Sequence, residues 1–200
     1  MPGTSTQHIK NSARSFVRGS ARSCVRRQPV EQEALRTLLA GDYHRYAQAF
    51  LLPAECRDAI EDTFAVLWLS FEDALASPDI RHYAWDILRS TVMAKTTYRD
   101  GRPALEAAVF DTVAAQDPHT SPGDQAAHVA RNLELFTAIS KLPDIQLDVM
   151  VLRHLCGFTP ERTSELLGVP LAAALSTERH ARRSLECALI LPPETGGPTP

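Results

Sequence analysis

The sequence lacks the short motifs that mark common enzyme sites and the long apolar runs that mark membrane spans. No GxSxG, P-loop, GxGxxG or HExxH pattern occurs in its 200 residues, so no nucleophilic, nucleotide-binding or zinc-protease site is predicted. We therefore expect a protein that is not an enzyme and needs no cofactor. No apolar run is long enough for a membrane span, and the lack of an apolar N-terminal segment favours a cytoplasmic protein over a secreted one.

Cysteine is also scarce. The four cysteines lie far apart and form no CxxC pair, which indicates reduced thiols rather than a disulfide framework. His154 and Cys156 are separated by one residue, which is not a usual zinc spacing. We therefore predict no metal site and expect these two side chains to serve in packing.

Acidic residues are missing from the first 30 positions, although the whole chain has a net charge of −3. The basic residues of this stretch recur mostly at every fourth position: Lys10, Arg14, Arg18, Arg22, Arg26 and Arg27. We predict a disordered basic arm. A phosphate-contacting arm and an organellar transit peptide are the alternatives. The rest of the chain is acidic, which is unusual for a stand-alone DNA binder and fits a protein that reaches DNA while docked on a larger basic partner.

The chain does contain apolar residues at helical spacing. Hydrophobic residues make up 44% of the sequence, which is enough to form hydrophobic cores. We predict an all-α fold of two small helical domains joined by a flexible linker. Helices are expected at 31–52, with a break or kink at Gly41, and at 54–69, 80–98 and 128–141. The predicted organisation is a basic disordered arm at 1–30, a first domain at 31–99, a linker at 100–127 with a short apolar helix at 105–113, a second domain at 128–190 and a disordered tail at 191–200.

The stretch 142–189 predicts three helices with two sharp breaks. Gly157 ends the first helix as a C-cap glycine would. Thr159 and Pro160 open a short second helix as N-cap and first residue, and Gly168 precedes the turn to a third helix at 171–189. The first helix is predicted to bury an apolar stripe: Ile145, Val149, Leu152 and Leu155. A short helix, a tight turn and a longer helix form the helix-turn-helix pattern, in which the second helix enters a DNA major groove.

This stretch resembles the C-terminal, promoter-binding domain of extracytoplasmic function (ECF) sigma factors, which is called sigma region four. The matching residues are Leu142, Pro143, Val149, Leu152, Arg153, Gly157, Glu161, Leu167, Gly168, Val169, Ala181, Arg182 and Leu185. The resemblance implies that the second domain is a sigma region four-like helix-turn-helix domain, and that the chain binds double-stranded promoter DNA.

A second block, CRDAIEDTFAVLW at 56–68, resembles the family's AEDLVQETFLRVW, the polymerase-binding helix of sigma region two. The first domain is thereby identified as sigma region two-like. The resemblance assigns the binding of the RNA polymerase core to this helix, with these residues: Asp58, Glu61, Asp62, Thr63 and Trp68. Glu61 replaces the family's glutamine, which keeps an acceptor but loses the amide donors. From the residues alone, Ile60, Phe64 and Leu67 are expected to form a buried stripe.

The resemblance also implies contacts with melted promoter DNA from 80–102, where Lys95 and Arg99 are the candidates. Tyr83 and Trp85 either pack in the core or stack on unpaired bases. In the third helix the family's Thr-Val-Lys-Ser-Arg-like run is replaced by residues 173–177. The remaining DNA-binding candidates are Ser176, Thr177, Arg179, His180, Arg182 and Arg183. Glu178 either accepts a hydrogen bond from cytosine or pairs with Arg182 along the helix.

Three functions follow as expectations. The first is a sigma factor-like transcription initiation protein that binds the RNA polymerase core and promoter DNA. The second is a sigma-like helix-turn-helix regulator that binds DNA without initiating transcription. The third is a protein-interaction module that binds polymerase or an anti-sigma factor without DNA. An anti-sigma factor is a possible partner in the first case as well.

Overall fold

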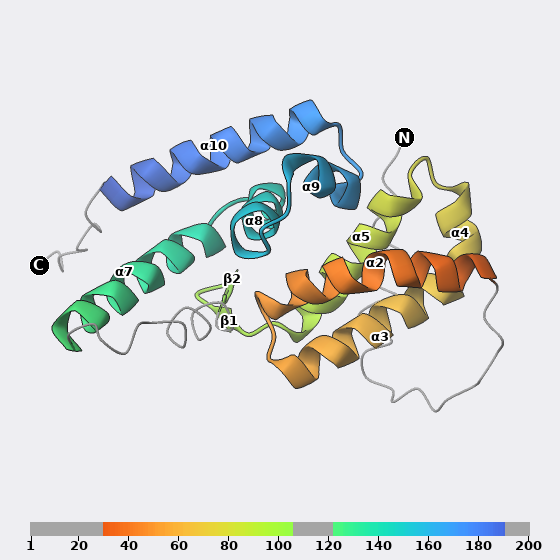
Figure 1. Cartoon of the computed structure of the whole chain (residues 1–200), viewed down its shortest axis with the longest axis horizontal. Helices are drawn as coiled ribbons and strands as arrows, with labels where there is room; N and C mark the ends of the chain where they lie inside the picture. Colours follow the sequence, from red (N-terminus) through yellow and green to blue (C-terminus); the bar gives the residue numbers. More distant parts are fainter. Residues whose placement is uncertain (1–29, 106–121, 191–200) are drawn as a thin grey trace, which may run out of the picture.

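The computed structural model describes residues 30–105 and 122–190, and these residues are helical almost throughout, so the predicted all-α fold is confirmed (Figure 1). A first group of helices lies in residues 30–105, called here the N-terminal half: α2 (Val30–Gln48), α3 (Pro53–Leu69), α4 (Phe71–Ala76) and α5 (Ile80–Lys95). A second group lies in residues 122–190, the C-terminal half: α7 (Pro122–Ser140), α8 (Asp144–Met150), the π-helical turn η1 (Val151–Leu155), α9 (Pro160–Leu167) and α10 (Leu171–Ile190).

In the N-terminal half, α3 packs against both α2 and α5. The predicted stripe of Ile60, Phe64 and Leu67 is buried between them. An aromatic cluster fills the centre, in which the ring of Tyr43 lies 6.0 Å from Phe64 and that of Tyr46 lies 4.7 Å from Trp85. Trp85 is only 2% exposed, so its ring packs in the core and does not face unpaired bases in this arrangement.

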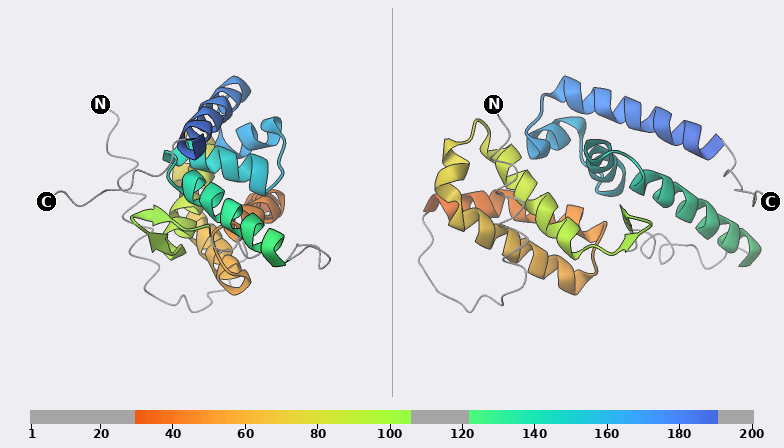
Figure 2. Two further views of the ribbon diagram at one scale, coloured as in Figure 1. Left: turned by 90° about the vertical axis from the view of Figure 1, so that its left-hand side faces the viewer. Right: turned by 180° about the vertical axis from the view of Figure 1, so that it is seen from behind.

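In the C-terminal half, α10 packs against α7, α8 and α9, and α7 and α10 run along its outer side (Figure 2). Leu152, Leu166 and Leu167 are almost completely buried. Of the predicted stripe of the first helix, Val149 and Leu152 are buried and Leu155 is half-buried. The prediction is wrong at Ile145, which is 44% exposed. Ile145 lies in the first turn of α8.

Several predicted boundaries are wrong. The helix α2 runs through Gly41 without a break, and α7 begins at Pro122 within the segment predicted as linker. The helix expected at 80–98 ends at Lys95, and the chain then forms a small antiparallel hairpin of β1 (Tyr98–Arg99) and β2 (Arg102–Pro103). Its two turn residues have positive φ angles, Asp100 at 51° and Gly101 at 72°, as an Asp-Gly hairpin turn requires. The arm, most of the linker and the tail lie outside the described residues.

The two halves contact each other through α2 and α5 on one side and α8 and α9 on the other (Figure 1). Asp148 of α8 is 2% exposed and accepts two hydrogen bonds, from the hydroxyl of Tyr46 at 2.7 Å and from Nε of Arg89 at 2.7 Å. Arg89 also lies 3.1 Å from Asp144. The buried apolar residues of both halves form one continuous cluster.

Gly168 is predicted to tolerate alanine worse than Gly157 does. Both have a left-handed backbone, with φ angles of 65° and 71°, so alanine costs either position about 1 kcal/mol. A Cβ atom at 157 meets nothing within 4 Å, whereas one at 168 lies 2.6 Å from the Cβ atom of His82. Urea denaturation of the two alanine variants is expected to show the larger loss of unfolding free energy for Gly168→Ala. Equal losses would contradict the close approach of the two halves.

The contribution of Asp148 to stability is predicted to decrease as pH rises. Burial raises the pKa of Asp148 to about 6, against the opposing effect of Arg89. A raised pKa in the folded state stabilises the fold at low pH, and this contribution is lost as pH rises through the folded-state value. Between about pH 4 and about pH 7, the unfolding free energy of the wild type should therefore fall relative to that of Asp148→Asn. Thermal melts of both proteins across this range test it. A wild type that gains stability relative to Asp148→Asn as pH rises would contradict it.

Candidate nucleic-acid interface

Residues 158–190 form the predicted helix-turn-helix. The side chain of Thr159 caps α9 by accepting a hydrogen bond from the backbone nitrogen of Arg162 at 3.2 Å, and Pro160 is the first residue of the helix. Gly168 ends α9 in the left-handed conformation, which glycine adopts without strain. Pro170 then precedes α10, so the break between the two helices is local and is encoded by these few residues.

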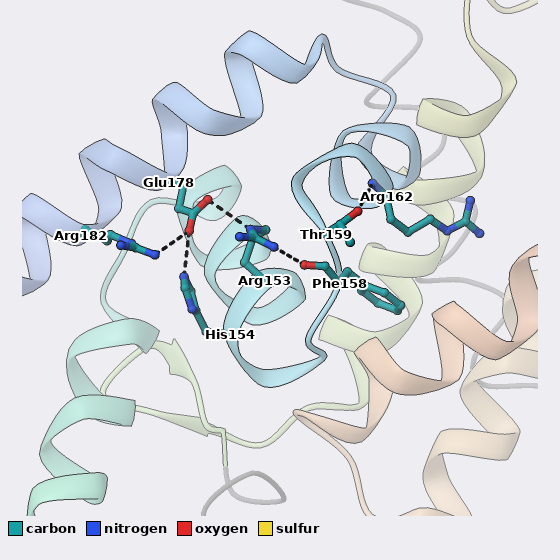
Figure 3. Close-up of polar contacts among 7 residues, drawn as sticks. All are labelled: Arg153, His154, Phe158, Thr159, Arg162, Glu178 and Arg182. Carbon is teal, nitrogen blue, oxygen red and sulfur yellow. Dashed lines mark hydrogen bonds and ion pairs between the residues drawn. The ribbon is translucent and has the colours of Figure 1, made fainter.

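A buried carboxylate fixes α10 against the rest of the helix-turn-helix (Figure 3). Glu178 of α10 is 6% exposed. One of its oxygens accepts from Nε of Arg153 at 3.2 Å. The other lies 3.1 Å from Nε2 of His154 and accepts from Arg182 at 2.9 Å. Arg153 also donates to the backbone carbonyl of Phe158, and so links α10, η1 and the segment that leads into α9.

This arrangement decides between the two expectations for Glu178. Both carboxylate oxygens are used within the protein, so Glu178 pairs with Arg182, and contact with cytosine is the wrong alternative for this conformation. Burial alone raises the pKa of Glu178, but the hydrogen bond and charge of Arg153, with the charges of Arg182 and His154, outweigh it and lower the pKa below its usual value. The sequence predicted only a packing role for His154 and not this contact, because Glu178 lies 24 residues further along the chain.

The outer face of α10 carries most of the predicted DNA-binding residues. Arg179, His180 and Arg183 are exposed, whereas Ser176 and Thr177 are half-buried. Arg179 and Arg183 lie one helical turn apart and form no ion pair with any residue in the described parts of the chain. Arg182 is exposed but pairs with Glu178. The geometry therefore leaves two arginines on one face that are available for phosphate contacts.

Only some of the residues of α3 that were predicted to bind polymerase are exposed in the structure. Asp58 is exposed. Glu61 is exposed and pairs with Arg36 of α2, and Asp62 lies 2.9 Å from the amine of Lys95. Thr63 has no exposed surface and donates to the carbonyl of Ala59 at 2.7 Å, so it offers nothing for a partner to contact in this conformation. Trp68 is half-buried and packs on Phe64 and Phe71.

The predicted contacts with melted DNA are spread along the end of α5 and the hairpin. Lys95 is engaged by Asp62, and Tyr83 is half-buried against the core. Arg99 is exposed on β1, directly opposite Arg102 of β2. The structure does not gather these side chains into one dense basic surface.

Comparisons with known proteins add little. No protein-family model matches the chain, and no curated protein matches it. A solved structure, that of CnrH in complex with the cytosolic domain of CnrY, is similar over 92% of this chain and 96% of that chain, at 17% identity and a TM-score of 0.46. A similarity of this size establishes neither the family nor the function. In residues 30–105 and 122–190, no helix is long and apolar enough to cross a membrane, and no group of three or more acidic, histidine or cysteine side chains could hold a metal ion.

Replacing Glu178 by glutamine is predicted to destabilise the protein by about 2 kcal/mol, because the guanidinium of Arg153 then loses its counter-charge. Because the pKa of Glu178 is lowered in the folded state, its ionised side chain stabilises the fold at pH values above the usual pKa range of glutamate. This stabilisation is lost as pH falls through the folded-state pKa. Urea denaturation at several pH values should show the difference between the wild type and Glu178→Gln shrinking in acid.

The matched control is Glu186→Gln, which removes an exposed carboxylate from the same helix. It is expected to change the unfolding free energy by no more than about 0.5 kcal/mol. Equal effects of the two substitutions would show that the contacts of Glu178 do not stabilise the fold.

Proposed function

We propose that this chain is a sigma factor-like transcription initiation protein, which binds the RNA polymerase core through α3 and promoter DNA through the helix-turn-helix of α9 and α10. The observation that carries the proposal is the outer face of α10, where Arg179 and Arg183 point away from a helix that is fixed from behind by Glu178. A second helical half with an acidic surface on α3 distinguishes the chain from a simple DNA-binding domain.

The way in which α10 is anchored supports its proposed role as the recognition helix. Glu178 and Ala181 face inward, and Arg179 and Arg183 face outward. Ser176 and Thr177, half-buried in the second turn of α10, have short side chains that suit contacts with base edges at close range. Arginines contact phosphates and set the register of the helix on the duplex. We therefore expect α10 to bind DNA with little dependence on sequence and to contact base edges through only a few side chains.

The surface of α3 supports the proposed contact with the RNA polymerase core. Asp58 and Arg57 are exposed side by side, and Asp58 forms no hydrogen bond or ion pair with another residue in the described parts of the chain. Charged residues without internal partners cost nothing to expose and are available to a partner of complementary charge. The acidic body of the chain weakens independent DNA binding, so the DNA contact is expected to depend on polymerase.

One observation favours a second candidate, a sigma-like regulator that does not initiate transcription. Glu61 and Asp62 are already paired with Arg36 and Lys95. A polymerase that used these carboxylates would have to displace both internal partners, which lowers the free energy gained on binding. This candidate predicts DNA binding without a stable complex with the polymerase core.

The proposal predicts that Asp58→Ala weakens the binding of core RNA polymerase about tenfold, because the exposed carboxylate of Asp58 is lost from the contact. A pull-down of core polymerase by the tagged full chain, titrated to give an affinity, measures it. Asp73→Ala is the matched control, because Asp73 is exposed on the neighbouring α4 and lies outside the proposed contact.

Two results would contradict the initiation function. If wild type and Asp58→Ala bind polymerase equally, α3 does not make the contact through Asp58. If the wild type forms no polymerase complex but still shifts duplex DNA in a gel, the protein is a stand-alone regulator.

A further inference from the structure

The first five residues of α10 have no polar side chains. From Gly168 to Leu175 no side chain carries a hydrogen-bond donor or acceptor, and α10 has no acidic residue in its first turn, where negative charge is favoured. Four of the five residues are exposed, all except Ala174. Leu171 is 38% exposed and Leu175 is 39% exposed. Consecutive exposed apolar residues on a helix are unfavourable unless they serve a contact.

This apolar end continues directly into the basic face of α10, which lies on the outer side of the molecule (Figure 1). An exposed residue recurs at every fourth position of the helix: Leu171, Leu175, Arg179 and Arg183. Residues with this spacing lie on successive turns, along one slowly turning stripe. The stripe therefore begins with two leucines next to the turn that follows α9, and ends with two arginines.

The position of the two leucines fits the major groove of DNA. In a helix-turn-helix, the N-terminal residues of the second helix contact base edges, and in α10 these residues include Leu171 and Leu175. Phosphate contacts of Arg179 and Arg183, further along the same stripe, fix the register of the helix on the duplex. The leucines are then the side chains that face the bases.

The apolar character of this end restricts which base it can recognise. Arginine reads guanine, and asparagine or glutamine reads adenine, through paired hydrogen bonds, but none of these residues occurs between Gly168 and Leu175. The apolar group that a base presents in the major groove is the 5-methyl group of thymine. Contact between this methyl group and a leucine side chain is favourable, because both surfaces are removed from water.

We propose that the N-terminal end of α10 recognises thymine through its methyl group, and that Leu171 and Leu175 make this contact. The preference is modest, because burying one methyl group changes an affinity about fourfold. It adds a preference for one base to the contacts of Ser176 and Thr177, since serine and threonine hydrogen-bond to several bases. The proposal rests on the DNA-binding part of the proposed function and is independent of polymerase binding.

The first test compares two duplexes that differ only in the thymine methyl groups. One is an alternating A·T duplex, and in the other every thymine is replaced by uracil, which keeps the base pairs, the charge and all hydrogen-bonding groups. Fluorescence anisotropy measures the affinity of the full chain for each duplex at low salt, where phosphate contacts are strongest. The wild type is expected to bind the uracil duplex about fourfold more weakly.

Substitutions test whether the two leucines make the contact. The double variant Leu171→Ala/Leu175→Ala shortens both side chains and keeps a high helix propensity. It is expected to bind the two duplexes within about twofold of each other. Leu189→Ala is the matched control, because Leu189 is 49% exposed at the other end of α10, and it should keep the wild-type ratio. Arg179→Gln should weaken binding to both duplexes alike, as the loss of a phosphate contact does.

A second measurement adds methyl groups instead of removing them. In 5-methylcytosine the methyl group occupies the same ring position as in thymine, so a methylated G·C duplex presents it in the major groove. Methylation of every cytosine in a G·C duplex of mixed order is expected to raise the affinity of the wild type about fourfold. The affinity of the double leucine variant should stay unchanged.

Three results would overturn the proposal. Equal affinity of the wild type for the thymine and uracil duplexes would show that no methyl group is recognised, and would leave DNA binding itself in place. A thymine preference that survives in the double leucine variant would assign the contact to other residues. A wild type that binds neither duplex, with or without core polymerase, would remove the DNA-binding function as well. Failure of the polymerase pull-down alone, with the thymine preference present, would remove only the initiation function.

Discussion

The contact between the two helical halves is organised around one buried carboxylate, that of Asp148. It lies between the hydroxyl of Tyr46 and the guanidinium of Arg89, 2.7 Å from each, and so ties α8 to both α2 and α5. A buried charge that loses its partners is strongly destabilising, so these three helices keep a fixed relation while the halves stay together. The helix that carries Arg89, α5, also packs against α9.

A second carboxylate acts in the same way on the other side of the segment that runs from α8 into η1. Asp148 faces the N-terminal half, and five residues later Arg153 faces Glu178 of α10. One short segment therefore sets both the docking of the helix-turn-helix on the N-terminal half and the orientation of its recognition helix.

The sequence predicted what is encoded locally. The start of α9 at Thr159 and Pro160, the turn at Gly168 and the buried stripe of α3 all follow from neighbouring residues. The hairpin at 98–103 was missed although its Asp-Gly turn is a strong local signal. The partners of Asp148 lie 59 and 102 residues away, and those of Glu178 include residues 24 and 25 positions earlier. Such pairs depend on the packing of whole helices, which no local pattern reports.

The proposed function requires that this chain directs RNA polymerase to promoters. The most direct test supplies the core polymerase with a pool of genomic DNA fragments, with and without the protein, and sequences the 5′ ends of the transcripts. The account predicts new, discrete 5′ ends that appear only with the protein and share a short upstream sequence. An unchanged distribution of 5′ ends, with polymerase active in a control reaction, would contradict it.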